Sequence, residues 1–104
     1  MTAWKYNLDM NGVQDIDIVK GGKILCVANQ GKKKAVIYIF VDQDETAREK
    51  IRVFIAGTGH PRDDIAETKY IGTLLFFGGA EVYHFFVEPK AKLFTESEKN
   101  GVDE

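Results

Sequence analysis

The sequence predicts an all-β fold, either a compact antiparallel β-sandwich or a barrel-like sheet of about seven strands, with one short surface helix. The apolar residues come in short runs, some alternating with polar residues and some apolar throughout, and glycine, asparagine and aspartate separate the runs. The one segment rich in helix formers has almost no apolar face, so it cannot cover a sheet. Apolar strands without apolar helices indicate a sheet that packs on itself or on a second sheet.

The first half of the chain is expected to form strands joined by tight turns. The expected strands are residues 3–8, 13–19, 23–30 and 35–42. In the second strand, the alternation Asp-Ile-Asp-Ile over residues 15–18 places the isoleucines on one side and the aspartates on a solvent-facing side. Turn signals such as Asn11-Gly12 and the lysine run 32–34 separate the strands, so successive strands are predicted to form β-hairpins.

Residues 42–50 (DQDETAREK) form the only segment that favours helix. Either Asp42 or Asp44 could cap one or two turns of helix, and Ala47 and its neighbours are helix formers. Because this segment lacks an apolar face, we expect a surface connection. A fifth strand follows over residues 50–57.

The last part of the fold is expected to be a hairpin of residues 70–79 and 80–88 that turns at Gly78-Gly79. Two glycines supply the positive φ that such a turn needs. We therefore expect a single antiparallel β-domain over residues 1–88. Residues 89–104 are expected to be a polar and partly disordered C-terminal tail, in which Leu93 and Phe94 either dock or start a short helix.

Charge and composition narrow the function classes. The 104 residues carry a formal net charge of −2, and without a clustered basic surface general nucleic-acid binding is not expected. The single cysteine, Cys26, excludes an internal disulfide, fits a reducing compartment and lies in an apolar run that predicts a small core residue. The N-terminus lacks the apolar stretch of a signal peptide, and no apolar run approaches the length of a membrane span, so a cytoplasmic protein is favoured.

Several predicted strands are apolar on both faces, namely VIYIFV, VFIA, TLLFF and VYHFFV. A sheet with one wet face should alternate, so strands of this kind need a cover on each side. Packing within the chain supplies one cover, and the remaining apolar surface predicts a homo-oligomer. The alternative is a monomer with an aromatic-rich core.

The polar loop that begins Gly-Thr-Gly-His-Pro is the candidate site. Its glycines allow backbone N–H groups to face a common point, and its hydroxyl, imidazole and guanidinium could bind a small anion such as a phosphate or carboxylate. The candidate ligand-binding residues are Gly57, Thr58, Gly59, His60, Arg62 and Tyr70. The loop lacks the spacing of a Walker loop or of a dinucleotide fingerprint, and the competing interpretation is an ordinary turn stiffened by Pro61.

Other chemistry has weaker support. The histidines, the cysteine and the loop aspartates lack metal-ligand spacing, so no metal site is predicted, and no motif indicates a cofactor. His84 lies within a predicted strand, where a hydrogen-bonded structural histidine is the expected role. Pairing of Cys26 with His60 or His84 stays open, but nothing local would activate the thiol.

Aromatic residues are frequent and could form a stacking surface for a nucleotide-like ligand, although most are expected to lie in the core. They are Trp4, Tyr6, Tyr38, Phe54, Tyr70 and Tyr83.

The segments KGGKILCVANQ, VFIAGTGHP and YIGTLLFFGGAEVYHFF together resemble a family of small uncharacterised proteins of bacteriophages and prophages. The resemblance covers most of residues 4–86, matches the N-terminus loosely and leaves the segment after Glu88 as an extension. It implies a phage gene product that acts in the cytoplasm of an infected bacterial host. It implies no reaction, ligand or catalytic residue. The positions that carry the shared motifs are Gly57, Gly59, His60, Pro61, Tyr70, Gly72, Gly78, Gly79 and His84.

These observations favour a non-enzymatic binding or interaction protein, an oligomeric β-domain that docks on a host or phage protein or sequesters a ligand. One alternative is a sponge that holds a small nucleotide-like or other anionic ligand at the Gly-Thr-Gly-His-Pro loop. A second is a small hydrolase in which His60 and a carboxylate act as acid and base. A third is a structural part of a virion.

Overall fold

Eight strands and two short 3₁₀ helices form within residues 1–94, which are the residues that the computed structural model describes. The strands are β1 (Thr2–Leu8), β2 (Val13–Val19), β3 (Lys23–Asn29), β4 (Ala35–Val41), β5 (Arg48–Gly57), β6 (Lys69–Phe76), β7 (Glu81–Val87) and β8 (Lys92–Leu93). The 3₁₀ helices are η1 (Asp63–Ile65) and η2 (Phe77–Gly79). No helix in this part of the chain is long and apolar enough to cross a membrane.

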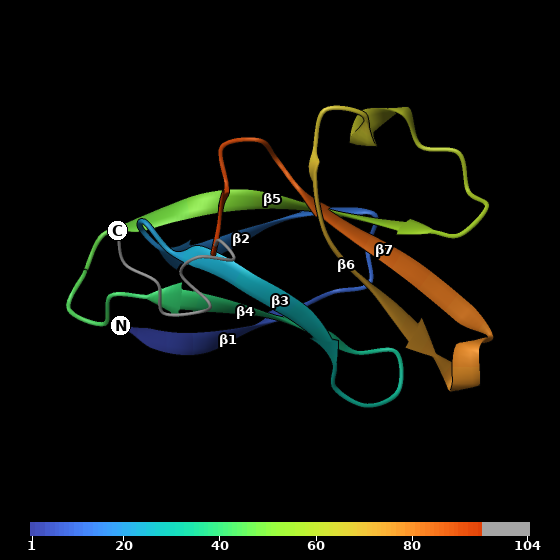
Figure 1. The fold of residues 1–104 in the computed structure, drawn as a ribbon, viewed down its shortest axis with the longest axis horizontal. Helices are drawn as coiled ribbons and strands as arrows, with labels where there is room; N and C mark the ends of the chain where they lie inside the picture. Colours follow the sequence, from blue (N-terminus) through green and yellow to red (C-terminus); the bar gives the residue numbers. More distant parts are fainter. Residues whose placement is uncertain (95–104) are drawn as a thin grey trace.

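The strands form two four-stranded sheets, in the orders β1-β4-β3-β8 and β2-β5-β7-β6 (Figure 1). All pairings are antiparallel except that of β3 with β8. The prediction of an all-β fold is confirmed, and the two separate sheets make it a sandwich. The sheets pack most closely where β3 meets β6, and a Cβ on Gly72 would lie only 2.8 Å from Cγ2 of Val27.

The core lies between the sheets and is built from one side of each long strand. Phe85, Ile37 and Val53 are fully buried in it. The expectation that most of the six aromatic residues named above lie in the core holds only in part, since Tyr6 and Tyr83 pack against the core but none of the six is fully buried and Tyr70 is 56% exposed. Branched aliphatic residues, which fit a pleated surface closely, fill most of the space instead.

Two of the predicted hairpins form, β3 with β4 and β6 with β7. The predicted hairpins of β1 with β2 and of β2 with β3 are wrong, because the chain crosses between the sheets after β1 and again after β2. A strand with one apolar face can bury that face from either sheet, so the turn sequences alone do not decide the partner. The second crossover is tight, since a Cβ on Gly22 would lie 2.7 Å from Cγ2 of Ile39.

The helix predicted over residues 42–50 is absent. Asp42 starts a turn in which its carbonyl accepts from Glu45 N at 3.0 Å and its carboxylate accepts from Asp44 N at 3.0 Å. β5 then begins at Arg48, opposite Val19 of β2. Extending the ladder of β5 satisfies backbone groups that a short helix without an apolar face would leave to solvent.

Cys26 is exposed, which corrects its prediction as a core residue. The pairing of β3 with β4 shifts register between Ile24 and Cys26. A bulge of this kind inserts an extra residue and reverses which side chains face the core. Ile24 and Val27 are therefore buried, and the thiol faces outward.

The segment after β7 packs on the sandwich as far as the description extends. Ala91 is buried, β8 pairs with β3, and Phe94 N donates to the Ile24 carbonyl at 2.9 Å. The ring of Phe94 meets that of Phe40 edge to face, with centroids 5.3 Å apart. Leu93 and Phe94 thus dock on the fold, and residues 95–104 of the predicted tail lie outside the described residues.

Candidate functional site

The outward side of the β2-β5-β7-β6 sheet carries a row of apolar side chains. Val13, Phe54, Phe86 and Tyr70 lie directly opposite one another across the four strands. The residues that flank them along β5 and β7 are buried, so the row points away from the core. Leu75 extends the apolar surface along β6 and is 55% exposed. We call this surface the outer patch, defined by Val13, Phe54, Tyr70, Leu75, Val82 and Phe86.

A chain of hydrogen bonds crosses the same side of the sheet. Nε2 of His84 lies 2.7 Å from the Thr58 hydroxyl, and its Nδ1 lies 3.0 Å from the hydroxyl of Thr73. The Thr73 hydroxyl is in turn 2.6 Å from that of Tyr70. The imidazole is half-buried and is held by hydroxyl groups on both ring nitrogens. We call these four residues the hydroxyl–imidazole chain.

Local backbone geometry places Thr58 and His60 at one end of this chain. β5 ends at Gly57, and Thr58 N continues the ladder by donating to the Val82 carbonyl at 3.0 Å. Gly59 then takes a φ of 85°, a value that glycine adopts without cost, and the chain reverses. The His60 ring folds back over Gly57, where a Cβ would lie 2.8 Å from its Nδ1.

A shallow depression with a volume of about 430 Å³ lies beside this reversal. Thr58, His60, Glu81 and Tyr83 contribute polar groups to its wall. Glu81 accepts a hydrogen bond from the Tyr83 hydroxyl at 3.0 Å and lies 3.5 Å from Nζ of Lys33. The Glu81 carboxylate is the main cause that raises the pKa of Lys33, and Tyr83 raises it further. The negative charge at the depression therefore has a partner within the protein.

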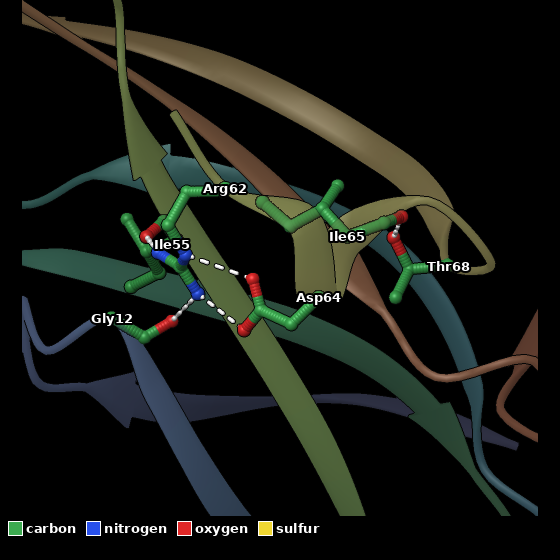
Figure 2. A network of polar contacts seen from close by, with 6 residues as sticks. All are labelled: Gly12, Ile55, Arg62, Asp64, Ile65 and Thr68. Atoms are coloured by element: carbon green, nitrogen blue, oxygen red, sulfur yellow. Dashed lines mark hydrogen bonds and ion pairs between the residues drawn. The ribbon is translucent and has the colours of Figure 1, made fainter. Parts of the chain in front are cut away.

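Arg62 lies outside the depression and has a structural role (Figure 2). Its Nη1 donates to the Ile55 carbonyl at 2.7 Å, and its Nη2 donates to the Gly12 carbonyl at 3.3 Å. The guanidinium also forms a two-pronged ion pair with Asp64, and this hydrogen bonding raises the pKa of Arg62. Arg62 thus fastens the loop to β5 and to the start of β2, and its Nε, Nη1 and Nη2 together make four hydrogen bonds within the protein.

The structure brings together Gly57, Thr58 and His60 of the predicted site, with Gly59 at the reversal between them. Tyr70 joins them only through Thr73 and His84, and Arg62 is directed elsewhere. The sequence favoured His84 as a hydrogen-bonded strand residue, which agrees with its contacts, but it did not predict Thr73. Its position opposite His84 depends on the register of β6 with β7, and a bulge between Tyr70 and Gly72 shifts that register.

In residues 1–94 the structure shows neither grouped metal ligands nor a histidine that is hydrogen-bonded to a carboxylate. This part of the chain has no cluster of three or more histidine, cysteine, aspartate or glutamate side chains that could hold a metal ion. The nearest carboxylate at the depression, Glu81, is bonded to Tyr83, and no hydrogen bond joins His60 to a carboxylate in the described chain. The arrangement suits hydrogen bonding and apolar contact.

A family model described as "Domain of unknown function (DUF7352)" matches residues 1–94. The chain belongs to the DUF7352 family. The match spans both sheets and all eight strands, so the DUF7352 domain includes the docked segment through Phe94. No curated protein and no solved structure matches the chain.

Proposed function

We propose that this DUF7352 protein is a non-enzymatic binding protein that engages a protein partner through the outer patch. The observation that carries the proposal is the row Val13–Phe54–Phe86–Tyr70 on the outward side of the sheet, in which Val13 and Tyr70 are exposed and the two phenylalanines are half-buried. Contiguous apolar surface of this kind marks interaction sites, because leaving it in water is unfavourable.

The hydroxyl–imidazole chain adds specificity to this surface. Apolar contact alone discriminates poorly between binding partners. Polar groups at fixed positions weaken the binding of any partner that leaves them without a hydrogen bond. Thr73 and His84 lie between the apolar row and Leu75, in the interior of the patch. A partner of matching shape would have to satisfy these groups as it covers the aromatic rings.

The patch also supports the proposal of a homo-oligomer, in which a second copy of the chain covers this face. In the cell, we propose a phage gene product that acts in the cytoplasm of an infected bacterium. The resemblance of its motifs to those of small phage and prophage proteins supports this setting.

Native mass spectrometry of the protein purified from its host tests the proposal, since it reports the subunit number and any co-purifying partner together. We expect assemblies above the monomer mass for the natural chain. Leu75→Glu should reduce them to the monomer because it places a charge in the patch. Ala3→Glu, on exposed β1 of the other sheet, is the matched control and should leave the assembly intact. A natural chain that stays monomeric and unaccompanied would contradict the proposal.

A second candidate function, the binding of a small ligand, is favoured by the depression beside Thr58 and His60. For the hydrolase alternative, His60 and Glu81 line the same depression, but within residues 1–94 no hydrogen bond joins them and Glu81 accepts from Tyr83.

A further inference from the structure

We propose that the depression beside Thr58 is a binding site for a small oxyanion and that protonation of His84 strengthens the binding. This inference rests on the second candidate function and does not depend on the outer patch. It assigns the ligand contact to Thr58, with His84 acting through the Thr58 hydroxyl. Arg62 is not assigned to the ligand, because its Nε, Nη1 and Nη2 already donate to Asp64 and to two backbone carbonyls.

The chemistry follows from the number of protons on the imidazole ring. A neutral ring has one N–H, so one of its two nitrogens must accept a hydrogen bond. When His84 Nε2 accepts from Thr58, the Thr58 hydrogen points inward and only lone pairs face the depression. When the ring is protonated, both nitrogens donate, and the contacts of 2.7 Å to Thr58 and 3.0 Å to Thr73 remain satisfied. The Thr58 hydroxyl is then always free to donate into the depression, next to a positive charge.

The surrounding groups favour an anion in the protonated state. Glu81 is the carboxylate at the depression, and Lys33 and the Tyr83 hydroxyl offset its charge. β5 contributes Ala56 opposite His84 and so adds no charge there. β6 contributes the Tyr70 hydroxyl through Thr73.

His60 is the other titratable group at the depression, and its exposed ring adds positive charge on the same side when protonated. Histidine is the side chain that ordinarily gains charge between pH 8 and pH 5. Protonation of the two rings would therefore change the depression from a site with compensated charge to a positive one.

Sulfate is the probe, because its charge of about −2 is constant over this pH range, unlike that of phosphate. The experiment measures its affinity for the full chain at pH 7.5 and pH 5.5 by two-dimensional NMR titration of the backbone amides. We expect about tenfold tighter binding at pH 5.5, the size of effect that one charge-assisted hydrogen bond produces. The largest amide shifts should fall on residues 57–60.

His84→Gln should remove most of the pH dependence, because glutamine can bond to Thr58 but does not gain a proton, and only the contribution of His60 remains. His60→Gln should weaken binding and keep the dependence. Thr58→Val should abolish binding at pH 5.5, and Thr2→Val, the same change on β1, should leave it unaltered. Thr58 is exposed, so Thr58→Val should fold. If His84→Gln fails to fold, the sulfate affinity of Thr58→Val still tests the anion site.

Equal sulfate affinity at both pH values would overturn the role of His84 protonation but not the anion site itself. Loss of the dependence in His60→Gln but not in His84→Gln would also overturn that role. Absence of sulfate binding by the natural chain, or normal binding by Thr58→Val, would overturn the anion site itself.

Discussion

The guanidinium of Arg62 and the carboxylate of Asp64 lie side by side, with Nε 2.9 Å from Oδ1 and Nη2 2.8 Å from Oδ2. The same guanidinium donates to the carbonyls of Gly12 and Ile55, so one side chain joins the long loop to β5 and to the residue that precedes β2. This relationship makes Arg62 a determinant of stability.

Arg62→Gln should lower the free energy of unfolding by about 1–3 kcal/mol, because charged donors to two backbone carbonyls are lost and the loop loses its attachment. Urea denaturation at pH 7 measures the change. Arg52→Gln is the matched control, since Arg52 pairs with Asp15 at an exposed position and should contribute little. Equal effects of the two substitutions would contradict the structural role of Arg62.

The stability contributed by Asp64 should disappear in acid. The Arg62 hydrogen bonds lower the pKa of Asp64 from 3.8. A carboxyl with a folded-state pKa below its unfolded value stabilises the fold above the unfolded value, and this stabilisation is lost as the pH falls through the folded value. The natural chain and Asp64→Asn should therefore differ in urea midpoint at pH 7 and converge below about pH 3.8. The effect will be modest because the pair is solvent-exposed.

The control for this experiment is the Arg62→Gln background, in which Asp64→Asn should show no such convergence. A difference between the natural chain and Asp64→Asn that stays constant down to pH 2 would show that the ion pair does not link stability to pH.

Gly72→Ala should destabilise the sandwich at the contact between its sheets. The added methyl would lie 2.8 Å from Cγ2 of Val27, so the Val27 side chain or one of the two strands must shift, at a cost of about 1–3 kcal/mol. In a Val27→Ala background the same substitution should cost less, because the opposing methyl groups are gone. Thermal melts of the four chains in this double-mutant cycle measure the coupling. Additive effects would show that the sheets do not meet at this point.

Cys26 should react with a thiol reagent in the native state. Its side chain is exposed, so labelling by a chromogenic disulfide should proceed without denaturant and leave the circular dichroism spectrum unchanged. The rate in native buffer should be close to that in urea. Labelling that requires urea would restore the interpretation of Cys26 as a core residue.

The sequence alone determined the all-β class, because a two-residue period and the lack of an apolar helix face are local properties of the chain. It also determined the hairpins of β3 with β4 and of β6 with β7, whose strands are joined by short turns with residues at positive φ such as Gly31 and Gly78. The polar loop that places Thr58 beside His60 was likewise evident in the sequence.

The tertiary structure alone decided which strands pair and which loop groups meet. β1 pairs with β4 and β2 with β5, although either strand could have buried its apolar face in a local hairpin. Arg62 meets Gly12 across 50 positions of the chain, and His84 meets Thr58 across 26. A bulge of one residue in β3 turned Cys26 outward, and another set the register of Thr73 opposite His84. Periodicity specifies which side of a strand is apolar, but the partner and register depend on packing between distant segments, where several arrangements bury the same residues.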